Sequence, residues 1–164
     1  MDSHPQMLGH TWIDNALLEH VSALAATSPR GRKNFNFHRS EDEASHRLLN
    51  AIEPGSYIRP HRHLDPTKDE TLIVVRGRLG ALVFDEAGSV VETAMLVAGG
   101  DCFGINLLCG TYHTLLALAP KTVFFESKAG PYRPLEMAEL APWAPAEGAR
   151  DVQAYLAALR TLFE

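Results

Sequence analysis

The stretch "GSYIRPHRHLDPTKDETLIVVRG", residues 55–77, decides the fold. It contains two histidines, His61 and His63, then a polar loop, and then an apolar run that opens at Glu70. Side chains alternate along a strand, so both imidazoles face the same way, with their Cα atoms about 6.6 Å apart. A hairpin between residues 63 and 70 returns Glu70 to the side of His63. The stretch therefore predicts two neighbouring strands with a polar site at their joined ends.

The middle of the chain shows the same period of two, punctuated by Gly, Pro and Asp clusters, as is typical of an all-β sandwich or barrel. Strands are expected near residues 33–38, 47–52, 56–63, 70–76, 79–84, 90–97, 101–106, 113–119 and 122–128. Several of them, such as "TLIVV" at 71–75, are apolar on both faces and need cover outside the barrel as well as inside. Terminal helices, an irregular arm or a second subunit can supply this cover, and we expect a homodimer.

Helical periodicity is confined to the two ends of the chain. Ile13, Leu17 and Val21 recur at helical spacing, and so do the apolar residues of "ARDVQAYLAALRTLF" at 149–163. Four prolines between residues 130 and 145 predict an irregular arm. We expect one domain over residues 1–164, with these parts: N-terminal helix and linker 1–32, β-barrel 33–128, Pro-rich arm 129–148 and C-terminal helix 149–164.

Composition limits the classes of partner. The chain has 164 residues, of which 46% are hydrophobic, and a net charge of -5, which suits one globular domain and disfavours a nucleic-acid or anionic-membrane surface. The N-terminal "MDSHPQMLGH" lacks the features of a signal peptide, and no apolar run approaches the length of a spanning helix. We predict a cytoplasmic protein with a small-molecule ligand, an anion or a sugar.

A later histidine completes a candidate metal site. His113 opens a strand after a glycine turn, which can return it to the same barrel mouth as His61, His63 and Glu70. Three imidazoles and one carboxylate suit a single Zn, Mn, Fe or Ni ion and leave room for water or substrate. Asp69 is a rival carboxylate, because a one-residue slip in the hairpin exchanges which side chain faces inward.

Two motifs resemble those of the cupin superfamily. The pattern Gly, H-x-H, Glu, Gly from Gly55 to Gly77 resembles the first cupin motif, with a longer gap before the glutamate. "LCGTYHTLLA" resembles the second, with Leu108 in place of a proline and Ala117 in place of an asparagine. The resemblance implies a mainly β fold, a double-stranded β-helix (the cupin jelly-roll barrel) that holds a divalent transition metal, here with an N-terminal and a C-terminal α-helix.

A narrower likeness covers most of the chain. Blocks such as "NFNFH" at 34–38, "GTYHT" at 110–114 and "ESKAGPYRPLE" at 126–136 resemble the WbuC-type cupin-fold metalloproteins. This family is found among bacterial genes for O-antigen and other surface polysaccharides. The resemblance implies a role in that biosynthesis.

Further side chains are candidates for substrate binding. Strand parity carried back from His61 places Tyr57 and Arg59 toward the metal, where Arg59 either pairs with an internal acid or binds a carboxylate or phosphate. The strand "RKNFNFH" turns Phe35 and Phe37 toward a core. Its other face is either solvated or a substrate wall suited to sugar hydroxyls, and it carries Arg32, Asn34, Asn36 and His38.

These parts suit a metal-dependent isomerase or epimerase acting on a sugar, a sugar phosphate or a nucleotide sugar. Glu70 or a neighbouring side chain such as Tyr112 would move the proton. Three alternatives remain: a non-catalytic module that binds or senses a metabolite, an Fe(II)-dependent dioxygenase, and a protein whose metal is purely structural.

Overall fold

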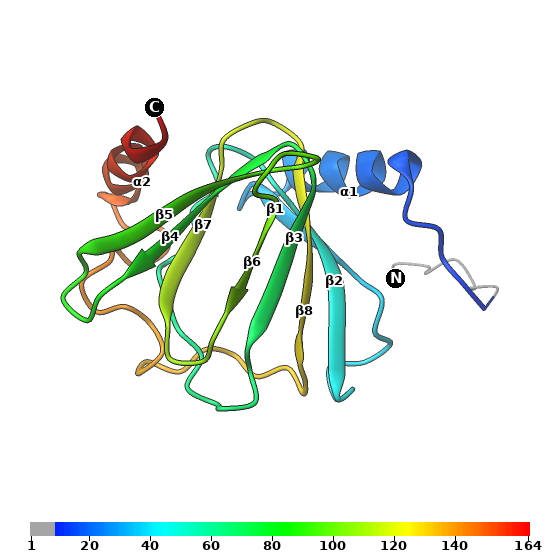
Figure 1. Ribbon diagram of the computed structural model, residues 1–164, viewed down its shortest axis with the longest axis horizontal. Helices are drawn as coiled ribbons and strands as arrows, with labels where there is room; N and C mark the ends of the chain where they lie inside the picture. The colour runs from blue at the N-terminus through cyan, green and yellow to red at the C-terminus, as the bar shows by residue number, and fades with distance from the viewer. Residues whose placement is uncertain (1–8) are drawn as a thin grey trace.

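The computed structural model describes residues 9–164, which form eight strands and two α-helices (Figure 1). The strands are β1 (Arg32–Asn36), β2 (Ser45–Ile52), β3 (Glu70–Arg76), β4 (Arg78–Phe84), β5 (Val90–Val97), β6 (Gly104–Leu107), β7 (Tyr112–Ala117) and β8 (Thr122–Ala129). They make two antiparallel sheets, one in the order β1-β2-β8-β3-β6 and one in the order β5-β4-β7. Residues 1–8 of the expected N-terminal segment lie outside the described residues.

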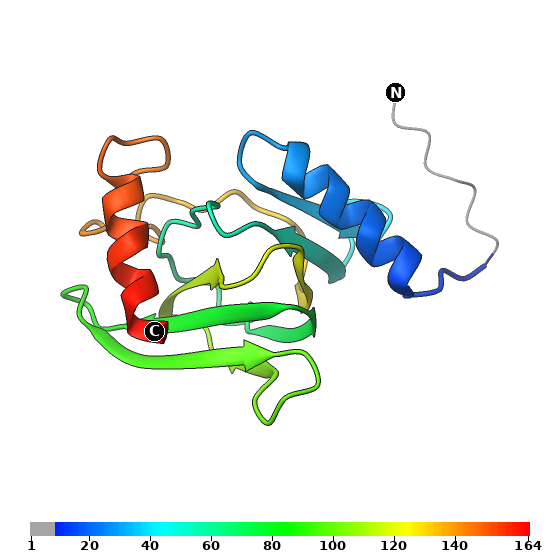
Figure 2. The same ribbon diagram turned by 90° about the horizontal axis from the view of Figure 1, so that it is seen from above.

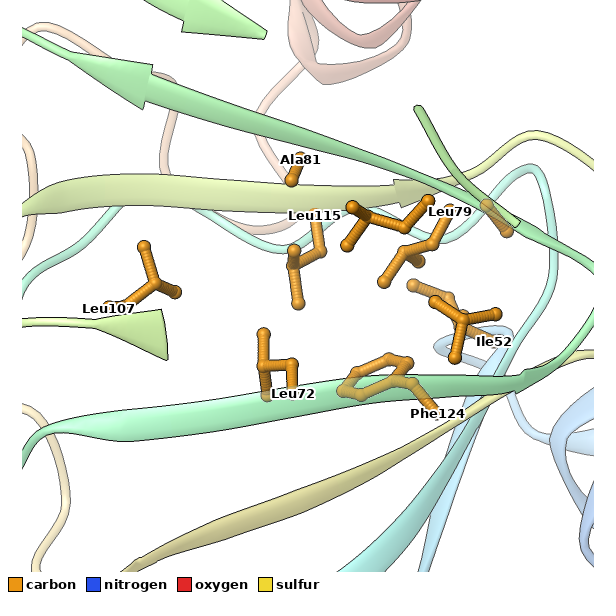
Figure 3. Close-up of a cluster of buried hydrophobic side chains, with 10 residues drawn as sticks. Ile52, Leu72, Leu79, Ala81, Leu107, Leu115 and Phe124 are labelled. Atoms are coloured by element: carbon orange, nitrogen blue, oxygen red, sulfur yellow. The ribbon is translucent and has the colours of Figure 1, made fainter. Parts of the chain in front are cut away.

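The main apolar core lies between the two sheets. Alternate residues of the facing strands meet there, as Figure 3 shows for Leu72 and Phe124 on one side and Leu79 and Leu115 on the other. Sheets that pack face to face bury one side of each strand in this way. The prediction of a mainly β jelly-roll fold with a helix at each end is confirmed.

The two helices cover the outer faces of different sheets (Figure 2). Helix α1 (Asn15–Thr27) begins at Asp14, whose carboxylate accepts a hydrogen bond from the Leu17 N–H, and its apolar stripe packs on β2 and β8. Helix α2 (Val152–Arg160) packs on β4 and β7 through Val152, Leu156 and Leu159. A short 3₁₀ turn (Thr161–Phe163) follows. Among the described residues, no helix has the length and apolarity needed to cross a membrane.

The strand expected over residues 56–63 does not form. The connecting segment, residues 53–69, makes only isolated bridges at His61, one to His113 and one to Leu140. Pro60 has no N–H to donate, which interrupts a regular ladder at this point. The arm, residues 130–148, supplies other partners: the Arg62 N–H donates to the Glu139 carbonyl, and the Ala141 N–H donates to the Pro60 carbonyl.

Gly77 joins β3 to β4 with a φ of +78°, and a Cβ atom there would lie 2.5 Å from Thr122 Oγ1 and 3.0 Å from Thr122 Cα. Gly99 has a similar φ of +71° with open space around it. We expect Gly99→Ala to lower the free energy of unfolding by about 1–2 kcal/mol, the cost of the left-handed backbone alone. Gly77→Ala should cost about 1–3 kcal/mol more, because the methyl group also clashes. Urea denaturation of both variants measures the difference, and equal losses would contradict the packing described at Thr122.

Candidate metal centre

His61 and His113 form the base of the candidate centre. Their backbones exchange two hydrogen bonds, of 3.1 and 2.9 Å, so their side chains stand on the same side with ring centroids 4.6 Å apart. Each Nδ1 lies 2.9 Å from the carbonyl oxygen of the residue two positions earlier. Because a carbonyl only accepts, each Nδ1 carries a proton and donates it, which leaves Nε2 as the ring nitrogen that can bind a metal.

Glu70 and His63 complete the cluster. Glu70 opens β3, and its carboxylate oxygens lie 2.9 Å from His63 Nε2 and 3.2 Å from His113 Nε2. His61, His63 and Glu70 offer ligand atoms that all lie within 4.8 Å of one another. Three of the four predicted side chains, His61, His63 and Glu70, therefore form one cluster at the end of the barrel where β3 begins, and His113 adjoins it through Glu70.

The donor chemistry fits a transition metal. In a neutral His113, Nε2 and the Glu70 Oε2 are both electron-pair donors, and at 3.2 Å they need a proton or a metal ion between them. Burial, together with the neighbouring His113, lowers the pKa of His61 to about 3, so this ring stays neutral and able to coordinate. Nitrogen and oxygen donors of this kind suit Zn, Mn, Fe or Ni.

Asp69 is engaged elsewhere. Its Oδ1 accepts a hydrogen bond of 2.8 Å from the Cys109 N–H, which ties the loop before β3 to the loop before β7. Glu70, next to it on the chain, is only 5% exposed and faces the histidines. The geometry favours Glu70 as the carboxylate ligand.

Lys128 and Glu126 are the charged groups at the centre that the sequence interpretation missed. Both lie on β8 with Lys128 paired in register to Glu70, and its Nζ is 3.2 Å from Glu70 Oε1 and 2.6 Å from Glu126 Oε1. Asn50 donates to the other Glu126 oxygen at 2.8 Å. The period of two in "TVFFESKA" does place Glu126 and Lys128 on the face of Phe124, which is the available sequence signal.

These neighbours set the charge state of the cluster. Burial raises the pKa of Glu70, but hydrogen bonding with His113 and His63 and the charge of Lys128 outweigh it and hold that pKa below its usual range. Burial likewise lowers the pKa of Lys128, and the two carboxylates beside it outweigh this and raise it above its usual range. Glu70 is therefore ionised and Lys128 is a cation at neutral pH.

A cavity of about 340 Å³ opens beside the centre. His61, His63 and Lys128 contribute to its wall, together with residues of the arm. Its remaining lining residues are His46, Leu64, Asp65, Lys68, Ala129, Tyr132, Arg133, Pro134, Leu135, Glu136 and Glu139. The cavity is large enough for a sugar-sized ligand next to the imidazoles.

Tyr57 and Arg59 are not among the residues that line this cavity. The Tyr57 hydroxyl donates to the Pro145 carbonyl at 2.8 Å, and Arg59 Nη2 donates to the Ala141 carbonyl at 2.8 Å. Their predicted orientation assumed a regular strand over 56–63, and that strand is absent. Both side chains hold the arm against the connecting segment.

Tyr112 does not fit its predicted catalytic role. It precedes His113 on β7, and neighbouring residues of a strand point to opposite faces. Its ring is 5% exposed, packs against Trp143 and stacks under the Arg62 guanidinium, 4.3 Å away. The alternation of side chains along a strand is itself a sequence signal that separates Tyr112 from His113.

The polar residues of β1 face away from Phe35 and Phe37, which pack in the cluster beneath α1, as predicted. Arg32 pairs with Glu147 at 2.9 Å, and the Asn34 amide donates to Asn36 at 2.6 Å. Arg32 and Asn34 line a second cavity of about 270 Å³.

His38 stacks on His46, with centroids 4.0 Å apart, and His46 lines the cavity at the centre. A substrate role for these four side chains stays a prediction.

Two antiparallel sheets face each other, and the histidine and glutamate cluster lies at one end of the barrel that they form. This arrangement is that of a cupin-fold protein. Residues 13–96 match the model of the domain of unknown function DUF6016. The chain belongs to this DUF6016 family. No curated protein sequence matches it.

Solved structures share the fold at low sequence identity. KdgF from Halomonas sp. is 19% identical with a TM-score of 0.50, over 76% of this chain and 91% of KdgF. The protein BH2720 from Bacillus halodurans is 17% identical with a TM-score of 0.50, over 76% of this chain and 85% of that protein. A recombinant pro-11S globulin of pumpkin is 12% identical with a TM-score of 0.50, over 64% of this chain and 27% of the globulin. At these identities the likeness establishes the fold.

Two neighbouring carboxylates allow a matched test of the ligand set. Glu70→Gln should weaken metal binding by at least about 100-fold, because an amide cannot supply an anionic oxygen. Asp69→Asn should retain the metal, because Asp69 bonds the Cys109 amide. Elemental analysis after dialysis and titration with Zn²⁺ measure both. If Asp69→Asn lost the metal and Glu70→Gln kept it, Asp69 rather than Glu70 would be the carboxylate ligand.

Proposed function

We propose that this protein is a metal-dependent cupin that acts on a sugar, a sugar phosphate or a nucleotide sugar, as an isomerase or epimerase of bacterial surface-polysaccharide synthesis. The observation that carries the proposal is the convergence of His61, His63, Glu70 and His113 beside a cavity of about 340 Å³. The sequence blocks at 34–38, 110–114 and 126–136, which resemble those of WbuC-type proteins, support a role in surface-polysaccharide synthesis.

The cavity argues against a purely structural metal. A structural site closes its coordination shell with protein ligands, whereas His61 and His63 line an open cavity that a ligand can enter. A bound divalent ion would act there as a Lewis acid toward a carbonyl or hydroxyl oxygen.

The chain's own groups cover the other needs of such a reaction. His61, His63 and Glu70, with His113 beside them, would hold the ion, and the adjoining cavity would receive the ligand. His46 also lines the cavity, and because its Nε2 donates to the Glu41 carbonyl at 3.1 Å, its Nδ1 is left to accept a hydrogen bond from a hydroxyl group. Isomerisation and epimerisation also need a proton acceptor near the reacting carbon, and His46, the histidine of the cavity wall that is not a proposed metal ligand, can serve.

The metal-loaded protein should be stabilised by one class of sugar ligand. A ligand at 100 times its Kd adds about 2.7 kcal/mol, which raises the Tm of a chain of this size by about 5–10 °C. Thermal-shift assays with sugar phosphates, nucleotide sugars and their neutral parent sugars measure the effect, with His61→Ala as the metal-deficient control and His20→Ala as the matched exposed histidine. A metal-loaded protein that no sugar class stabilises would contradict the proposed substrates.

Proton exchange separates an enzyme from a binding module. An isomerase or epimerase removes a carbon-bound proton, so incubation of the stabilising ligand in D₂O should replace that proton with deuterium. Proton NMR of the ligand follows its loss, and a bound ligand without exchange or turnover would favour the binding module.

A further inference from the structure

The Lys128 ammonium lies beside the Glu70 carboxylate, which is also a proposed ligand of the metal ion. Its Nζ is 3.2 Å from Glu70 Oε1, an oxygen of the proposed metal ligand, and 2.6 Å from Glu126 Oε1. The side chain is 22% exposed and forms part of the cavity wall. Lys128 is thus shared between two buried carboxylates and the space that a ligand would occupy.

A site that only had to hold a metal would be better without this ammonium. A positive charge beside a ligand carboxylate competes with a divalent ion for the same oxygen. The chain has a lysine at position 128 despite this competition, although an apolar residue there would continue the inner face of β8. The ammonium is useful when a second anion enters the centre.

The charges at the centre indicate how much negative charge that anion carries. Glu70 and Glu126 contribute two negative charges and Lys128 contributes one positive charge, so the three sum to -1. A divalent metal brings the sum to +1. One singly charged anion neutralises it, whereas a phosphate monoester, with a charge of about -1.5 to -2 at neutral pH, overshoots.

The rim of the cavity does not change this balance much. Lys68 and Arg133 stand there with Asp65, Glu136 and Glu139. Asp65 accepts hydrogen bonds from Thr67, and Glu139 accepts from the N–H groups of Leu64 and Glu136. Lys68 is buried, with its ammonium donating to the Pro131 carbonyl at 2.7 Å, and Glu139 is half-buried, so these two opposite charges cancel in the sum. Asp65, Arg133 and Glu136 are exposed, and water screens their charges.

We propose that Lys128 and the metal centre together form a subsite for a carboxylate, so that the ligand is a sugar acid or a similar hydroxycarboxylate. A carboxylate offers two oxygens, one toward the metal and one toward the Lys128 ammonium, in a charge-assisted hydrogen bond. The assignment rests on the proposed metal-dependent function and narrows its substrate class.

The test uses calorimetric titration of the Zn²⁺-loaded full chain with glucuronate, glucose 1-phosphate and glucose as probes. We expect glucuronate to bind most tightly. Lys128→Met should weaken glucuronate binding by roughly 10- to 100-fold and leave that of glucose unchanged. Lys128→Arg should retain most of the affinity for glucuronate. Lys121→Met, which removes an exposed lysine, should bind glucuronate as tightly as the wild-type protein does.

The partner Glu126 separates a specific contact from net charge. Lys128→Met combined with Glu126→Gln removes one positive and one negative charge, so the total stays the same while the ammonium is gone. This double variant leaves no unpaired buried carboxylate at position 126, which favours folding. The proposal predicts that it binds glucuronate as weakly as Lys128→Met. Recovery of affinity in the double variant, unchanged affinity in Lys128→Met, or equal binding of glucose 1-phosphate overturns the subsite.

Metal affinity provides an independent readout. Lys128→Met should bind Zn²⁺ several-fold more tightly, because the competing cation next to Glu70 is removed. If the unchanged chain binds no metal, the proposed function fails and the subsite with it. If it binds Zn²⁺ but not glucuronate, the subsite alone fails.

Discussion

The pair of backbone hydrogen bonds between His61 and His113 is the contact on which the candidate centre depends. The two bonds, of 3.1 and 2.9 Å, fix the irregular connecting segment to an ordered strand of the smaller sheet. Directly opposed residues of an antiparallel pair present their side chains on one side, which is how two imidazoles from distant parts of the chain converge. The arm secures the same segment from its other edge, at Pro60 and Arg62. The centre therefore has a rigid frame although half of its ligands lie outside the strands.

Charge burial links the stability of this end of the barrel to its chemistry. Glu70 lies on the same face of β3 as Leu72 and Val74, which belong to the apolar core, and an isolated carboxylate in that position would be costly. Lys128 and the histidines offset the cost by contacting the carboxylate directly. The same burial keeps His61 neutral, as a metal ligand must be. One arrangement thus meets a structural need and prepares the donor atoms.

The sequence predicted the parts of the fold in which side-chain burial and backbone pairing go together. A period of two located the strands of both sheets, and it placed Phe35 and Phe37 on the face that α1 covers. It failed over residues 56–63, where Pro60 and the contacts with the arm prevent a regular ladder and buried residues do not alternate with exposed ones. Lys128 could not be assigned because its role depends on the pairing of β8 with β3, and strand order is a non-local property that periodicity does not contain.

The fold alone does not determine what the centre does. KdgF and a pumpkin pro-11S globulin share it at 19% and 12% identity, and one fold commonly hosts unrelated functions. A jelly-roll core requires apolar side chains on the inner face of each strand, and β8 provides them only as far as Phe124. Beyond it stand Glu126 and Lys128, although apolar residues of similar size would often be as stable as a buried ion pair. Lys128 does offset the burial of Glu70, but a barrel without a buried carboxylate at position 70 would need neither Lys128 nor Glu126. These charges therefore belong to the site rather than to the core, and their purpose is to be sought in the metal and in the ligand that enters the cavity.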